Sequence, residues 1–127
     1  MKLLAFDFQI KEIDGKEVYK QVLETSKGWE NSKNLMYVVG ATKASYLADI
    51  RKIIPESFLL VPGVGAQGGN LQEVCDYGMT DQIGLLINSS RGILYASKQA
   101  DFAEAAAEKA SELQAQMAEV LDSNSLI

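Results

Sequence analysis

Short, continuous runs of apolar residues recur along the chain and predict buried β-strands. Three of these runs end at a glycine, a proline or a polar residue, namely Leu35–Val39, Phe58–Val61 and Gly84–Ile87. Runs of this length without polar alternation are typical of parallel strands that are buried on both faces. An earlier apolar stretch, Leu3–Ile10, contains Asp7 and Gln9, and we interpret it as a strand or an extended lead.

The segments between these runs carry apolar residues at helical spacing. A helix is predicted from about Gly15, with Asp14 as its N-cap and Glu17 three residues later, as in a capping box. Thr42 can cap a second helix, and Pro55 ends it.

Two further helices follow the same logic. Asn70 and Glu73 can cap a short helix that Gly78 ends, and Asp101 with Glu104 opens a long one. The long helix has an apolar stripe formed by Phe102, Ala106, Ala110, Leu113, Met117 and Leu121. Strands that alternate with helices in this way predict an α/β fold with a parallel sheet and right-handed crossovers.

Length limits how much of an α/β architecture the chain can form. It has 127 residues, of which 47% are hydrophobic, so it can bury a sizeable core. A complete (β/α)₈ barrel, or TIM barrel, takes about 250 residues. We therefore expect a single domain over residues 1–127 that forms only part of such a barrel.

Composition excludes several classes of function. The net charge is −5, which argues against a nucleic-acid binder because such proteins need a basic face. The absence of histidine excludes Ser-His and Cys-His nucleophile pairs and histidine metal sites, and we expect neither a metal nor a cofactor. One cysteine, no signal peptide and no apolar stretch of about 18 residues favour a cytoplasmic protein without membrane contact.

Two loops that follow predicted strands carry residues suited to binding an anion. The first runs from Pro62 to Gly69 and contains Gly63, Gly65, Gly68 and Gly69, which allow positive φ angles or close approach of the backbone to a ligand. It leads into a helix N-terminus, where free amides and the helix dipole favour an anion, and Gln67 adds a side-chain donor.

The second loop is Asn88–Gly92, in which Ser89 and Ser90 precede Arg91. The guanidinium of Arg91 can hold two phosphate oxygens at once, and the amides of Ser90 and Arg91 can add donors. Both loops leave the carboxyl ends of consecutive strands. In (β/α)₈ barrels the loops after the seventh and eighth strands commonly form a phosphate site. We therefore predict a phosphate site between the two loops.

Other candidates have simpler interpretations. Lys11 and Asp14 could form an acid–base pair, but solvated surface charge explains them better. Cys75 lies beside Val74 in a predicted helix and is expected in the core. The carboxylates between Asp101 and Glu119 fit a solvated helix face rather than a metal cluster.

The loop motifs resemble those of one enzyme family. Val38–Thr42, Leu60–Gly69 and Leu86–Arg91 are similar to segments of the bacterial, long-chain orotidine 5′-phosphate decarboxylases, and the resemblance runs from about Asp7 to Leu121. Residues 1–13 are a poorly matching lead, and residues 122–127 are expected to be a frayed tail. The resemblance implies that the three strands are the last three of the barrel.

The resemblance also assigns roles to the loop residues. It implies that Gln67 reaches the nucleotide phosphate and that Arg91 binds it directly. Amides around Gly68 and of Ser90 and Arg91 would complete the cradle, Gly63 and Gly69 would belong to the same binding site, and Pro62 would lie near the pyrimidine. The implied reaction is conversion of orotidine 5′-monophosphate to uridine 5′-monophosphate and carbon dioxide, a step of pyrimidine biosynthesis.

The chain lacks the lysine on which that chemistry depends. The family places it in a D-x-K-x-x-D pattern, and no such pattern occurs here, because Asp7 stands four residues before Lys11 rather than two. We therefore expect this chain to bind a phosphate or a nucleotide monophosphate but to be inactive alone. A non-catalytic phosphate-binding half-barrel and a fragment of another phosphosugar barrel enzyme remain as alternatives. Open sheet edges also predict a homodimer or swapped oligomer.

Overall fold

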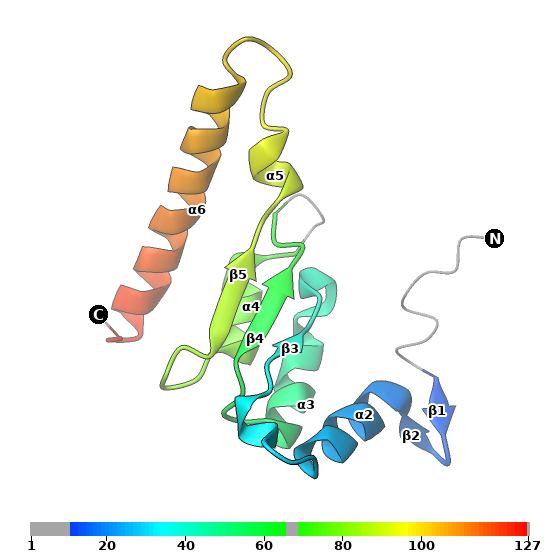
Figure 1. Cartoon of the computed structure of the whole chain (residues 1–127). Helices are drawn as coiled ribbons and strands as arrows, with labels where there is room; N and C mark the ends of the chain where they lie inside the picture. The colour runs from blue at the N-terminus through cyan, green and yellow to red at the C-terminus, as the bar shows by residue number, and fades with distance from the viewer. Residues whose placement is uncertain (1–10, 66–68, 127) are drawn as a thin grey trace, which may run out of the picture.

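The computed structural model describes residues 11–65 and 69–126, and its centre is a three-stranded parallel sheet (Figure 1). The strands are β3 (Tyr37–Val38), β4 (Leu59–Pro62) and β5 (Leu85–Asn88), in the order β3-β4-β5. The prediction of an α/β fold with consecutive parallel strands is therefore confirmed. The predicted segment Leu3–Ile10 lies outside the described residues.

Two helices link the strands and cover one face of the sheet. They are α3 (Ser45–Ile53) and α4 (Leu71–Gly78), and Figure 1 shows both behind the strands. The side chains that are fully buried between sheet and helices are Leu47, Leu59, Val61 and Val74. Cys75 is also buried there, as expected.

The opposite face of the sheet is open, which corrects the expectation that all strands are buried on both faces. Val38 on β3 is 70% exposed and Leu86 on β5 is 45% exposed. The strand register places Val38, Leu60 and Leu86 in one row across the sheet. Met36 and Phe58 come just before β3 and β4, two positions ahead of this row, so the alternation of side chains puts them on the same side, and both are exposed. We call these five residues the open sheet face.

A β-hairpin precedes the first helix, where a longer helix was predicted. Strands β1 (Glu12–Ile13) and β2 (Lys16–Glu17) pair antiparallel around Asp14 and Gly15, which have φ angles of 54° and 75°. Two consecutive positive φ angles fit a type I′ turn, for which Asp-Gly is a favoured pair. Asp14 is therefore not a helix cap, and α2 (Val18–Lys27) begins after the hairpin.

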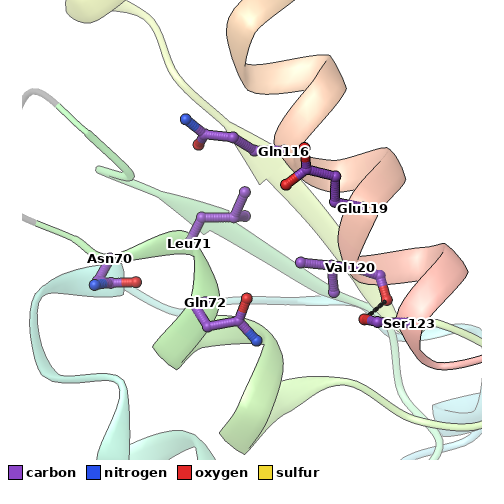
Figure 2. A pocket seen from close by; sticks show the side chains of 7 residues that line it. All are labelled: Asn70, Leu71, Gln72, Gln116, Glu119, Val120 and Ser123. Carbon is purple, nitrogen blue, oxygen red and sulfur yellow. Dashed lines mark hydrogen bonds between the residues drawn. The ribbon is translucent and has the colours of Figure 1, made fainter.

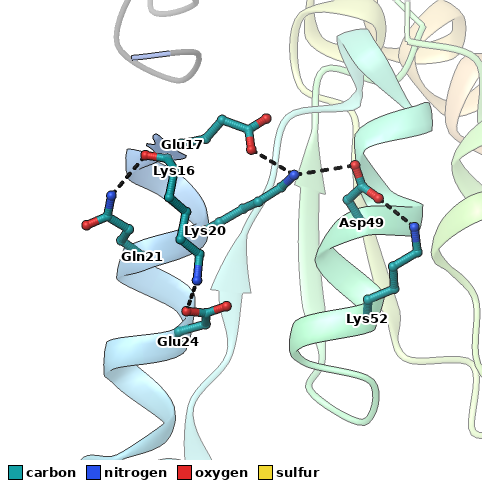
Figure 3. A network of polar contacts seen from close by, with 7 residues as sticks. All are labelled: Lys16, Glu17, Lys20, Gln21, Glu24, Asp49 and Lys52. Carbon is teal, nitrogen blue, oxygen red and sulfur yellow. Dashed lines mark hydrogen bonds and ion pairs between the residues drawn. The ribbon is translucent and has the colours of Figure 1, made fainter. Parts of the chain in front are cut away.

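A network of ion pairs joins α2 to α3 (Figure 3). The ammonium of Lys20 lies 2.7 Å from Glu17 and 3.7 Å from Asp49, and Asp49 also pairs with Lys52 at 2.7 Å. The hydrogen bond from Lys52 lowers the pKa of Asp49 below its ordinary value, and Lys20 adds to the effect. Lys16 on β2 and Glu24 on α2 form a further ion pair. Most of these groups are exposed, so the network orients the two helices more than it stabilises them.

The segment between β3 and α3 also differs from the prediction. Thr42 lies within a 3₁₀ turn at Ala41–Lys43 and makes no capping hydrogen bond to α3, which begins at Ser45. The turn buries the side chain of Ala41, which is only 2% exposed. This turn is therefore part of the core at the carboxyl end of the sheet.

The guanidinium of Arg51 ties the other end of the sheet together. It donates to the carbonyl oxygens of Gly78 and Ser57, each at 2.6 Å, and to that of Gly84 at 2.9 Å. These residues lie at the end of α4, before β4 and before β5. Burial lowers the pKa of Arg51, and the carbonyls compensate the buried charge.

The C-terminal part of the chain projects beyond the sheet, and Leu113, Met117 and Val120 pack against the core (Figure 1). A short helix, α5 (Arg91–Leu94), leads to the long helix α6 (Phe102–Ser123). Asp101 precedes α6 but does not cap it, because its carboxylate accepts from Ser97 at 2.6 Å instead. Of the α6 side chains only Val120 is buried. Within residues 11–65 and 69–126, no helix has the length and apolarity that crossing a bilayer requires.

Candidate phosphate-binding site

The two loops predicted to bind phosphate leave the sheet side by side. Strands β4 and β5 are parallel neighbours, and their register pairs Pro62, the last residue of β4, with Asn88, the last residue of β5. Both loops therefore leave the carboxyl end of the sheet at the same level. This juxtaposition of the loops was predicted from the order of the elements.

The loop after β4 folds back on itself through backbone hydrogen bonds. The amide of Gly65 donates to the carbonyl of Gly69 at 2.9 Å, and the amide of Gly69 donates to the carbonyl of Gly63 at 3.3 Å. Gly63 and Gly65 have φ angles of +92° and +82°, a region that residues with a side chain rarely adopt. The predicted site residues Gln67 and Gly68 lie outside the described residues.

Both ends of this loop are anchored in the core. Val64 is 4% exposed and forms an isolated parallel bridge with Gly69. A Cβ atom at position 69 would lie 2.5 Å from the Cβ of Ala41 and 2.8 Å from the carbonyl oxygen of Gly63. The loop after β4 thus packs without space against the turn that follows β3, and only glycine fits at position 69.

A helix N-terminus follows the loop, as predicted. The side-chain oxygen of Asn70 accepts from the amide of Glu73 at 3.2 Å, so Asn70 is the N-cap of α4. The first amides of a helix lack partners within the helix. The amides of Leu71 and Gln72, at the start of α4, can therefore donate to an anion beside the glycine loop.

The loop after β5 forms a tight turn into α5. The hydroxyl of Ser90 donates to the side-chain oxygen of Asn88 at 3.2 Å, and the Ser90 carbonyl accepts from the amides of Ile93 and Leu94 at 3.1 and 2.8 Å. These bonds fix the direction in which Arg91 leaves the backbone. The short helix α5 was not predicted, because Arg91–Leu94 spans only one turn and has no cap signal of its own.

Arg91 is exposed, and its guanidinium makes no hydrogen bond or ion pair with any residue that the structure describes. A guanidinium without an internal partner keeps all five of its N–H donors for a ligand. Arg51 is the contrasting case, because its guanidinium already donates hydrogen bonds to backbone carbonyls. Of these two arginines, only Arg91 is available to bind an anion.

A cavity of about 520 Å³ borders the same helix start, between the first turn of α4 and the last turns of α6 (Figure 2). Its lining consists of Asn70, Leu71, Gln72, Gln116, Glu119, Val120 and Ser123. It contains a carboxylate and no cationic side chain, so its charge disfavours a phosphate. Sequence reasoning missed it, because it arises from the loose packing of α6 against α4.

Lys11 and Asp14, the possible acid–base pair, lie on the surface, as the simpler interpretation predicted. Lys11 and Asp14 are both exposed, and Asp14 lies in the turn of the N-terminal hairpin. Val18 donates its amide to the carbonyl of Lys11 at 2.8 Å, which places that segment at the start of α2. Neither residue lies on the loops after β4 and β5.

Comparison with known proteins identifies close relatives. No family model matches the chain. The chain is 70% identical over 119 residues to the orotidine 5′-phosphate decarboxylase of Flavobacterium johnsoniae, a match that covers 94% of this chain and 44% of the relative. It is 69% identical over 118 residues to the enzyme of the same name from Christiangramia forsetii, covering 93% of this chain and 43% of the relative.

Solved structures show the same likeness in three dimensions. The UMP synthase of Leishmania donovani superposes with a TM-score of 0.67 at 40% identity, over 86% of this chain and 24% of that protein. The OMP decarboxylase of the same organism superposes with a TM-score of 0.64 at 34% identity, over 87% of this chain and 42% of that protein. The chain is therefore homologous to the orotidine 5′-phosphate decarboxylases, and it spans less than half the length of the curated relatives it matches.

Proposed function

We propose that this chain carries the phosphate-binding end of an orotidine 5′-phosphate decarboxylase and that its loops after β4 and β5 hold the 5′-phosphate of a nucleotide monophosphate. The observation that carries the proposal is the pairing of Pro62 with Asn88, because it sets a glycine loop beside Arg91, whose guanidinium has no partner among the described residues. In this assignment β3, β4 and β5 are the last three strands of a (β/α)₈ barrel.

Each loop contributes a different kind of donor. The loop after β4 offers the backbone amides around Gly63 and those that begin α4, while the amides of Gly65 and Gly69 hold the loop itself in shape. The loop after β5 offers the amides of Ser90 and Arg91 and the Arg91 guanidinium. Amides at a helix N-terminus and a forked guanidinium are complementary to phosphate in shape and charge. Gln67 and Gly68 belong to this proposed cradle by resemblance, and Pro62 would lie beside the pyrimidine.

The decarboxylation step needs residues that this sequence does not contain. A lysine between two aspartates would supply the proton to the carbon that loses carbon dioxide, and the aspartates would supply a preorganised charge array. The chain lacks the D-x-K-x-x-D pattern. We therefore assign it binding of the phosphate group and no turnover of its own.

The experiment is a titration of the purified chain with uridine 5′-monophosphate and, in parallel, with uridine. The two ligands differ only in the phosphate, so the proposal predicts heat of binding for the nucleotide and none for the nucleoside. Equal binding of both would contradict a phosphate site.

A phosphate-binding module without any catalytic partner is the second candidate. It would use the same pairing of the two loops, with a purpose of its own. The two candidates differ when a polypeptide that carries the D-x-K-x-x-D segment of a relative is added. A decarboxylase part should then gain activity, whereas a freestanding module should not.

A further inference from the structure

Asn88 ends strand β5 on the side of the sheet that faces away from α3 and α4. Burial alternates along this strand, since Leu85 is buried and Leu86 is exposed, and Asn88 follows Leu86 by two positions. Alternate residues of a strand point to the same side, so the Asn88 side chain shares the side of Leu86. The register sets it beside Pro62, whose strand alternates in the same way. Asn88 is therefore a polar side chain at the carboxyl end of the open sheet face, whose own residues are apolar.

The hydrogen bond to Ser90 leaves the nitrogen of the Asn88 side-chain amide without a partner. The amide oxygen accepts from the hydroxyl of Ser90 at 3.2 Å, which fixes how the amide group is turned. The nitrogen carries two N–H donors, and they bond to no residue in the described part of the chain. Gln21 differs, because its amide nitrogen donates to the carbonyls of Ile13 and Lys16. The Asn88 nitrogen is thus available to an oxygen atom of a ligand.

Asn88 lies on its strand just before the groups that are proposed to hold the phosphate. Those groups belong to Arg91, three residues later, and to the loop that begins at Gly63, and both lie beyond the ends of their strands. The Asn88 side chain therefore lies beside the part of a ligand that is attached to the phosphate. In a 5′-nucleotide this part is the sugar. An amide is a neutral donor, so it can stand close to a phosphate where a carboxylate would be repelled.

We propose that the side-chain nitrogen of Asn88 donates a hydrogen bond to a sugar oxygen of the bound nucleotide and so directs the sugar over the carboxyl end of the open sheet face. The inference rests on the proposed function, because it takes the position of the phosphate from the loops after β4 and β5. It adds a residue that binds what is attached to the phosphate. Inorganic phosphate has no sugar oxygen, so its binding does not depend on the Asn88 nitrogen.

A role for Asn88 only in shaping the loop makes a different prediction. If its oxygen served merely to hold the Ser90 hydroxyl, loss of Asn88 would disturb the amides of Ser90 and Arg91. Every ligand that carries a phosphate would then bind more weakly by the same factor. If the nitrogen contacts the sugar, only ligands that contain a sugar lose affinity. Inorganic phosphate, ribose 5-phosphate and uridine 5′-monophosphate therefore distinguish the two roles.

The test is calorimetric titration of the wild-type chain and of Asn88→Leu with these three ligands. Leucine is similar in size and has no polar group, and Asn88 is exposed, so the substitution removes no core contact. We expect Asn88→Leu to weaken binding of the two sugar phosphates about two- to tenfold in Kd, the effect of one neutral hydrogen bond, and to leave the affinity for inorganic phosphate unchanged. Asn88→Gln keeps an amide and should recover part of the loss.

Asn34→Leu is the matched control, because it removes the same group from the turn before β3, at the other end of the sheet, and should change the binding of none of the three ligands. Equal weakening of all three ligands in Asn88→Leu would overturn the sugar contact and leave the phosphate site standing. Unchanged binding of the sugar phosphates in Asn88→Leu would overturn it too. A wild-type chain that binds none of the three ligands would overturn the proposed function and this inference with it.

Discussion

Gly69 and Ala41 are in such close contact that a Cβ atom at position 69 would lie 2.5 Å from the Cβ of Ala41. The contact joins the loop after β4 to the turn after β3. We predict that Gly69→Ala lowers the free energy of unfolding by about 1–3 kcal/mol, the usual penalty for inserting a methyl group into a packed site. Urea denaturation measures the change.

Two further variants separate steric conflict from a general effect of alanine. Gly40→Ala is the matched control, because its Cβ would meet nothing within 4 Å and its φ angle is −66°. Gly69→Ala combined with Ala41→Gly should recover only part of the loss, since the Gly63 carbonyl oxygen still lies 2.8 Å from the new Cβ. A Gly69→Ala chain as stable as the wild type would show that the loop is not packed as described.

The Arg51 guanidinium provides a second test, at the opposite end of the sheet. Arg51→Met leaves the carbonyls of Gly78 and Ser57 without the donor shown here, and an unsatisfied buried polar group costs about 1–3 kcal/mol. The control is Lys52→Met, which removes a neighbouring cation whose side chain is 76% exposed and should hardly change the free energy of unfolding. If the two substitutions lowered the free energy of unfolding equally in urea denaturation, the hydrogen bonds of the Arg51 guanidinium would not stabilise the fold as described.

The purified chain should not decarboxylate orotidine 5′-monophosphate. The reason is that the lysine–aspartate array is missing from its sequence. Loss of substrate absorbance over hours is the assay, and a sample of a full-length relative is the positive control. Activity that persists through repurification and disappears in Arg91→Ala would refute this account of the chemistry.

The sequence predicted the central sheet well because that part of the fold depends on local signals. Short apolar runs placed β4 and β5 to within one residue, and the Asn70–Glu73 spacing predicted a cap that the structure contains. The juxtaposition of the two loops followed from strand order alone. It required only that consecutive parallel strands be neighbours.

The remainder was not predicted, because competing local signals and tertiary context decided it. Asp14 and Gly15 fit either a helix start or a hairpin turn, and the positive φ angles show that the turn prevailed. The exposure of Val38 has another cause. An apolar run predicts burial on both faces, but whether a face is covered depends on which other elements are present.

The central claim is that the loops after β4 and β5 form a phosphate site, and its most direct test is calorimetric titration of Arg91→Ala with uridine 5′-monophosphate. Loss of a charged hydrogen bond should weaken binding by about 1.5–3 kcal/mol, or at least roughly tenfold in Kd. Lys33→Ala is the control, because it removes the same charge from the turn before β3, at the other end of the sheet. The account predicts weakened binding in Arg91→Ala and unchanged binding in Lys33→Ala. Unchanged affinity in Arg91→Ala would contradict it.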